Sequence, residues 1–186
     1  MIGELPTALE VGGELLRIRS DFRVVLNIYA AWNDPELTPE EQCIVCICNL
    51  YEEPERITQE NAQEAVEKAY WFCAGGEMPL DEREPIKVID WEQDERLIFP
   101  AINKAAGHET RSLPYLHWWS FVGLLGEVGE GLLSQVLHIR TKRAKGKKLE
   151  KWEAEYYRDH RSLIDLKPRY TKEELAERDR INAMLG

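Results

Sequence analysis

The chain has 186 residues, of which 44% are hydrophobic and 31% are charged, so it is long enough to bury a core without disulfide bonds. No stretch reaches the roughly 18 uninterrupted apolar residues of a membrane span, and the start, MIGELPTALE, lacks the basic region and apolar run of a signal peptide. We therefore expect a soluble, cytosolic protein without a membrane partner.

Charge is unevenly distributed along the chain. Residues 1–110 carry 9 Lys and Arg against 23 Asp and Glu, whereas residues 111–186 carry 15 against 11. The first part is thus strongly acidic and the second weakly basic. An acidic body repels nucleic acid, while a basic tail offers one patch to an anionic partner. The same asymmetry favours head-to-tail self-association, which leaves a homo-oligomer open.

The N-terminal residues 9–18 predict a β-hairpin. Apolar residues alternate on both sides of Gly12-Gly13, and this pair can take the positive φ of a tight two-residue turn. Leu15 interrupts the alternation, so the register stays open.

Helical periodicity accounts for most of the remaining sequence. The clearest start is Thr38-Pro39-Glu40-Glu41, where Thr38 and Glu41 can form a capping box and Pro39 lies where its missing N–H costs nothing. A second capping box, Thr171 with Glu174, starts the last helix. The other expected starts are Ser20 or Asp21, Thr58 or Gln59, Asp90, Ser112, Leu132 and about residue 148.

Prolines complicate the middle of the chain. Residues 77–89 contain two prolines and no helical period, so we expect a loop with a short strand at Ile86–Ile89. Pro100 lies inside the helix expected after Asp90. A proline in that position removes a hydrogen bond and costs about 3 kcal/mol in a straight helix, so we expect a kink or two short helices.

These elements predict a mainly α fold of the α+β class. A helical domain with an N-terminal β-hairpin covers residues 1–139, and a basic, charged helical C-terminal extension covers residues 140–186.

The segment PYLHWWSFVGLL, residues 114–125, is apolar nearly all the way round a helix. Such a helix belongs at the centre of a small protein. Its polar stripe, His117 and Ser120, then needs hydrogen-bonding partners. The alternative is that an edge of Trp118 or Trp119 reaches the surface as a binding anchor, since tryptophan is enriched among residues that dominate binding energy.

The cysteines favour packing over metal binding. Three of the four lie in CIVCIC, among Ile and Val, which suits a reducing compartment. Cys43 and Cys46 have the C-x-x-C spacing, but no second pair follows, and zinc needs four ligands. No phosphate-binding loop, dinucleotide fingerprint or nucleophile elbow appears. We therefore expect no enzymatic activity, cofactor or metal.

The segment RTKRAKGKKLEK, residues 140–151, has seven basic residues in twelve. Basic clusters bind phosphates or acidic protein surfaces. Three glutamates nearby dilute the positive field, so a protein partner is favoured over nucleic acid. Together with the two adjacent tryptophans, the candidate protein-binding residues are Trp118, Trp119, Arg140, Lys142, Arg143, Lys147, Lys148 and Trp152.

Four stretches resemble, in order, the bacteriophage gene-product-fifteen family, small proteins of siphophage and prophage tail modules. These stretches are LPTALEVGGELLRIRSDFR, AYWFCAGG, VIDWEQDERLIFPAINKAAG and LPYLHWWSFVGLL. The resemblance covers roughly residues 5–140. The hairpin followed by DFR and the LHWW-x-F-x-x-LL element are fairly specific together.

This resemblance implies a place beside the genes for the major tail protein and the tape measure, where tail assembly chaperones are usually encoded. Such a chaperone coats the long, helical tape measure before tail polymerisation. We therefore expect a non-enzymatic tail-assembly protein in the host bacterial cytoplasm, with the tape measure protein and/or the major tail protein as partners. Nucleic-acid binding by residues 140–151 is the alternative.

Overall fold

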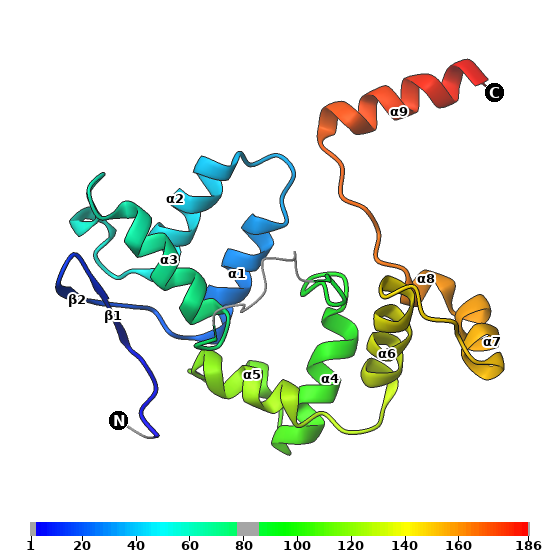
Figure 1. Ribbon diagram of the computed structural model, residues 1–186, viewed down its shortest axis with the longest axis horizontal. Coiled ribbons are helices and arrows are strands. Elements are labelled where there is room, and N and C mark those ends of the chain that lie inside the picture. The colour runs from blue at the N-terminus through cyan, green and yellow to red at the C-terminus, as the bar shows by residue number, and fades with distance from the viewer. Residues whose placement is uncertain (1–2, 78–85, 186) are drawn as a thin grey trace.

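The computed structural model describes residues 3–77 and 86–185, which are mainly helical with one two-stranded sheet (Figure 1). The strands are β1 (Ala8–Val11) and β2 (Glu14–Arg17). The α-helices are α1 (Phe22–Trp32), α2 (Pro39–Leu50), α3 (Ala62–Cys73), α4 (Glu95–Ala106), α5 (Trp118–Gly126), α6 (Leu132–Ala144), α7 (Lys151–Asp159), α8 (Arg161–Ile164) and α9 (Lys172–Leu185). The predicted fold class is confirmed.

The hairpin forms as predicted, and the structure fixes its register. Gly12 and Gly13 have φ of 60° and 78°, which only glycine adopts readily, and they close a two-residue turn. Leu9 pairs with Leu16, and both side chains are buried. Leu15 is 72% exposed, so it faces solvent and does not disturb the alternation.

Helices α1, α2 and α3 pack together beside the hairpin (Figure 1). The capping box of α2 is formed, because Thr38 Oγ1 accepts from the Glu41 N–H at 3.2 Å and the Glu41 carboxylate accepts from the Thr38 N–H at 2.8 Å. Helix α3 begins at Ala62 rather than near residue 58. The intervening residues form a turn in which Asn61 Oδ1 accepts from the Thr58 N–H at 2.7 Å.

Helix α4 begins four residues later than expected, because its N-cap is Asp94 rather than Asp90. Asp90 Oδ1 accepts from the backbone N–H groups of Glu92 and Gln93, so this side chain caps a turn that precedes the helix. The helix continues through Pro100 as one segment, and the expectation of two short helices is wrong. Pro100 and Arg96 are both exposed, so water can reach the Arg96 carbonyl that lacks a helical donor.

The strand expected at Ile86–Ile89 is wrong, because residues 86–90 have no regular structure. Their backbone is held by a side chain instead, since Arg140 Nη1 donates to the Val88 carbonyl at 3.0 Å. The greater part of the loop expected over residues 77–89, residues 78–85, lies outside the described residues.

Helix α5 begins at Trp118, so the expected cap at Ser112 is wrong. The residues before it are extended because they pair with the chain that leads into α1. The Phe22 N–H donates to the Leu116 carbonyl, and the Trp118 N–H donates to the Ser20 carbonyl at 2.8 Å. This long-range pairing outweighs the local helical tendency of residues 113–117.

The centre of the protein is an aromatic cluster around α5, as its sequence predicts. Phe121 stacks on Phe22 with ring centroids 4.5 Å apart, and Phe99 and Trp118 lie within 6 Å of the same ring. Helices α1, α4 and α5 supply these side chains, so the cluster joins the N-terminal helices to the middle of the molecule.

The C-terminal part continues from this core. Helix α6 runs without a break across the predicted boundary at 139/140 and contacts α4 and α8. The single helix expected from about residue 148 is divided at His160 into α7 and α8. Helix α9 begins with the predicted capping box of Thr171 and Glu174 and extends away from the other helices (Figure 1). Residues 172–184 are all exposed.

Candidate functional site

The two adjacent tryptophans attach α5 to the end of α3. The Trp118 Nε1–H donates to the Cys73 carbonyl at 2.8 Å, and the Trp119 Nε1–H donates to the Phe72 carbonyl at 2.9 Å. Trp118 is 1% exposed, so it does not form part of an exposed binding surface. Trp119 is half-buried, and its indole covers Gly76, where a Cβ atom would lie only 2.8 Å from the ring.

His117 has a structural position at the start of α5. Its Nδ1 accepts from the Trp119 N–H at 3.0 Å, and its Nε2 lies 2.9 Å from the Pro6 carbonyl. Because a backbone N–H can only donate, Nδ1 must be the acceptor and Nε2 carries the proton. Both ring nitrogens are therefore used to cap the helix and to hold the N-terminal segment.

Arg140 is buried rather than available to a partner. Its guanidinium pairs with Asp94 through two hydrogen bonds of 2.6 and 2.9 Å, and the two side chains are 6% and 3% exposed. Other guanidinium N–H groups donate to backbone carbonyls, including that of Ile164. The predicted role of Arg140 in an exposed basic patch does not fit this position.

Lys142 and Arg143 also form ion pairs with carboxylates of the same chain. Lys142 Nζ lies 2.5 Å from Glu153 Oε1, and this contact, with the Glu150 N–H, lowers the pKa of Glu153 to about 2. Arg143 pairs with Asp165 and lies over the ring of Tyr157. These ion pairs reduce the positive charge that the basic segment presents outward.

Four predicted residues lie on the surface, and one of them, Arg143, is paired with Asp165. Lys147 and Lys148 are exposed between α6 and α7, and neither has an ion-pair partner among the residues that the structure describes. Trp152 is 49% exposed, and its Nε1–H donates to Glu150 Oε2 at 3.0 Å. The exposed part of the predicted site is therefore small.

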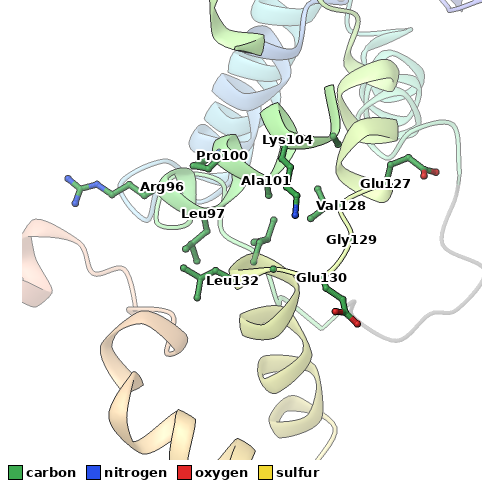
Figure 2. A pocket seen from close by; sticks show the side chains of 13 residues that line it. Arg96, Leu97, Pro100, Ala101, Lys104, Glu127, Val128, Gly129, Glu130 and Leu132 are labelled. Carbon is green, nitrogen blue, oxygen red and sulfur yellow. The ribbon is translucent and has the colours of Figure 1, made fainter. Parts of the chain in front are cut away.

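A groove that sequence reasoning missed lies between α4 and the start of α6 (Figure 2). This α4–α6 groove has a volume of about 430 Å³ and is bounded by one face of α4 and by the segment 127–133. Most of its lining is apolar, and Leu132 is 48% exposed within it. The apolar lining residues include Leu97, Pro100, Ala101, Val128, Leu132 and Leu133.

Charged side chains of both signs surround the groove. Figure 2 shows the Lys104 ammonium reaching over the groove, while Arg96, Glu127 and Glu130 point away from it. None of these four has an ion-pair partner in residues 3–77 and 86–185. An apolar floor with unpaired charges at its edges suits the apolar stripe and polar flanks of an amphipathic helix.

Residues 127–131 of the segment GEVGEG form one wall of this groove. A Cβ atom built on Gly129 or Gly131 would meet nothing within 4 Å, so the space beside this segment is open. Small residues on the facing side of α4, Ala101 and Ala105, keep it open from the other side. This complementarity between two distant segments is not visible in the sequence.

The C-terminal arm, by which we mean residues 165–185, is attached to the residues before α4 through Asp90. This side chain is 1% exposed, and it pairs with Lys87 at 3.0 Å and with Arg169 at 2.9 Å. Burial by itself raises the pKa of Asp90, but hydrogen bonds from Gln93, Lys87 and Arg169 outweigh it and lower the pKa to about 2.

These contacts predict an acid-sensitive attachment of the arm. Because the folded-state pKa of Asp90 lies below its ordinary value of 3.8, its stabilising contribution is complete above about pH 5 and is lost as the pH falls toward 2. We expect the difference in free energy of unfolding between wild type and Asp90→Asn to shrink over this range in denaturant titrations. An unchanged difference between pH 5 and pH 2.5 would contradict the assignment.

The cysteines do not form a metal centre in the described residues, where no group of three or more His, Cys, Asp and Glu side chains could hold an ion. Burial, with a smaller contribution from Cys43, raises the pKa of Cys46 to about 12. The Cys46 thiol is therefore protonated at neutral pH and packs as a small apolar side chain. No described helix is long and apolar enough to span a bilayer.

Comparison with known proteins gives one match, to a protein family. The searches of curated proteins and of solved structures found no match. The family model described as Bacteriophage Gp15 protein matches residues 1–166, which include the α4–α6 groove and exclude α9. Since the match covers most of the chain, this protein belongs to the bacteriophage Gp15 family.

Proposed function

We propose that this phage protein is a non-enzymatic tail-assembly chaperone that holds helical segments of the tape measure protein in the α4–α6 groove. The open apolar groove is the observation that carries the proposal. A tape measure is long and helical, so it offers repeated amphipathic faces. Such a face places apolar side chains at i, i+3, i+4 and i+7, which is the pattern that a groove between two helices accepts.

The size and polarity of the groove favour reversible binding. Its volume of about 430 Å³ accommodates a few side chains rather than a whole helix face. The charges of Lys104, Glu127 and Glu130, which have no ion-pair partner among the described residues, provide a polar rim that can set the orientation of a partner. A small apolar centre with a polar rim is typical of complexes that form and dissociate. A chaperone must release its client when the tail tube polymerises.

The exposed C-terminal elements provide a second contact area. Lys147 and Lys148 carry positive charge that no described residue pairs with, and α9 projects as a helix without buried residues over positions 172–184. An isolated helix of this length is only marginally stable in water. We propose that these elements bind the major tail protein or a further part of the tape measure in the host bacterial cytoplasm. Two weak contacts on one protein would raise the overall affinity.

The test is copurification of the full chain with tape measure fragments and, separately, with the major tail protein. Ala105 is exposed in the groove, so Ala105→Glu places a charge there with little effect on the core. We expect this variant to weaken tape measure binding by about tenfold or more, which corresponds to about 1.4 kcal/mol. Ala154→Glu is the matched control, because Ala154 is an exposed alanine of α7 outside the groove lining.

The outcomes separate the parts of the proposal. Binding that is lost in Ala105→Glu and retained in Ala154→Glu supports the groove. Equal binding by both variants would show that the groove is not the binding site, but it would leave the proposed chaperone function standing. If the chain binds neither phage protein, the proposed function is wrong. The nucleic-acid alternative has less support, because Arg140, Lys142 and Arg143 are engaged in ion pairs. It predicts a mobility shift at low salt that Lys147→Glu and Lys148→Glu abolish.

A further inference from the structure

The outer edge of β1 carries backbone groups that have no hydrogen-bond partner in the part of the chain that the structure describes. The sheet of the described residues has only β1 and β2, so the second edge of β1 has no strand neighbour there. The Ile18 N–H donates to the Thr7 carbonyl at 2.9 Å, which makes the odd-numbered residues of this strand the ones bonded to β2. The N–H and C=O groups of Ala8 and Glu10 therefore point outward.

A groove runs beside this edge. It has a volume of about 400 Å³ and lies between β1 and α3, with Pro6, Ala8 and Glu10 on one side and Lys68 and Trp71 on the other. Trp71 is half-buried and presents an apolar ring to the groove. An added strand would thus find backbone partners on β1 and an aromatic surface for one of its side chains.

Charge indicates the chemistry of the occupant. Glu10 and Glu67 line the groove and are exposed, and Glu64 lies next to it, with its carboxylate accepting from the Gly12 N–H at 2.8 Å. Among the described residues that line the groove, Lys68 is the one cation beside these carboxylates. The surplus of negative charge favours an extended segment that carries lysine or arginine beside an apolar residue.

Two features argue against a second copy of this chain as the occupant. Antiparallel pairing of two β1 strands would bring the acidic edges of both copies together, which is unfavourable. The exposed basic segment of this chain, residues 145–149, is held in place, because Leu149 packs against the core and the next N–H, that of Glu150, donates to Glu153. A segment of another protein remains.

We propose that the outer edge of β1 is a β-augmentation site that binds an extended, basic segment of another protein. This site is separate from the α4–α6 groove, so it does not depend on the proposed chaperone function. Main-chain hydrogen bonds to Ala8 and Glu10 provide the affinity, and the carboxylates with Trp71 select a basic and apolar side-chain pattern.

The test compares two replacements of Glu10 with a defined probe. The peptide acetyl-KVKVK-amide is titrated into the full chain and followed by NMR, with acetyl-EVEVE-amide as the charge-reversed control. Glu10→Ala removes the carboxylate and keeps the outward N–H, whereas Glu10→Pro removes both. Because this N–H does not bond to β2, the proline variant is expected to keep the hairpin.

The expected result is a saturable shift of the Ala8 and Glu10 amides with the basic peptide and slower hydrogen exchange at both amides. Glu10→Pro should bind about tenfold more weakly than Glu10→Ala, since it cannot form the central main-chain hydrogen bond. If Glu10→Pro fails to fold, Ala8→Pro against Ala8→Gly gives the same comparison. Equal binding by the proline variant and its control, equal binding of the acidic peptide, no binding, or shifts confined to the α4–α6 groove would each overturn the proposal.

Discussion

Asp94→Ala is expected to lower the free energy of unfolding by about 3–5 kcal/mol, because it leaves the guanidinium of Arg140 charged, buried and without its counter-ion. Both side chains are less than a tenth exposed, and two hydrogen bonds of 2.6 and 2.9 Å join them. The same carboxylate also accepts from the Asp90 N–H at 2.9 Å, so its removal leaves a second buried donor unpaired.

Equilibrium denaturation of four chains measures this effect: wild type, Asp94→Ala, Arg140→Met and the double variant. The double variant should be more stable than the sum of the two single losses predicts, because no uncompensated charge remains in it. Asp159→Ala is the matched control, since the ion pair of Asp159 with Arg158 is exposed and should contribute at most about 0.5 kcal/mol. A loss below 1 kcal/mol in Asp94→Ala would show that water reaches the Arg140 guanidinium.

The ion pair between Asp94 and Arg140 explains why Arg140 does not belong to the binding surface that the sequence of the basic segment predicts. Arg140 and Asp94 are 46 positions apart, and nothing in the local sequence of either residue indicates the other. Lys142, which pairs with Glu153, gives the same lesson over a shorter separation. A run of basic residues identifies where positive charge lies along the chain, but its carboxylate partners are set by the tertiary packing of α4, α6 and α7.

Elements that depend on neighbouring residues were predicted well. The hairpin needs only Gly12-Gly13 and the flanking alternation, and both capping boxes need a hydroxyl and a carboxylate three residues apart. The central position of α5 followed from its apolar surface on all sides, because such a helix cannot be stable against water. In each case the physical cause lies within a few residues.

Elements that depend on distant contacts were missed or misplaced. The start of α5 is set by backbone pairing of residues 116–118 with residues 20–22, almost a hundred positions away. The α4–α6 groove needs the small residues of α4 to face the glycines at 129 and 131. Local patterns do not encode either relationship, which is why the candidate site had to come from the structure.

Trp118→Ala is expected to cost about 3–5 kcal/mol in free energy of unfolding, as large aromatic truncations in well-packed cores do. Trp118 is 1% exposed and contacts three rings, with centroids at 5.6 Å for Trp91 before α4, 5.9 Å for Tyr29 of α1 and 5.8 Å for Phe121 of its own helix. Removing the indole would leave a cavity at the junction of α1, α3 and α5, which those rings cannot fill without leaving their own contacts.

Two further variants separate packing from hydrogen bonding at this position. Trp118→Phe retains a ring but loses the Nε1–H that donates to the Cys73 carbonyl, and that carbonyl keeps a second donor, the Tyr29 hydroxyl at 3.2 Å. Trp118→Phe should therefore recover most of the free energy of unfolding that Trp118→Ala loses. Trp119→Ala should cost less than Trp118→Ala, because Trp119 is half-buried. Equal losses of unfolding free energy at the two positions, measured in thermal and denaturant unfolding, would contradict the central role of Trp118 in the core.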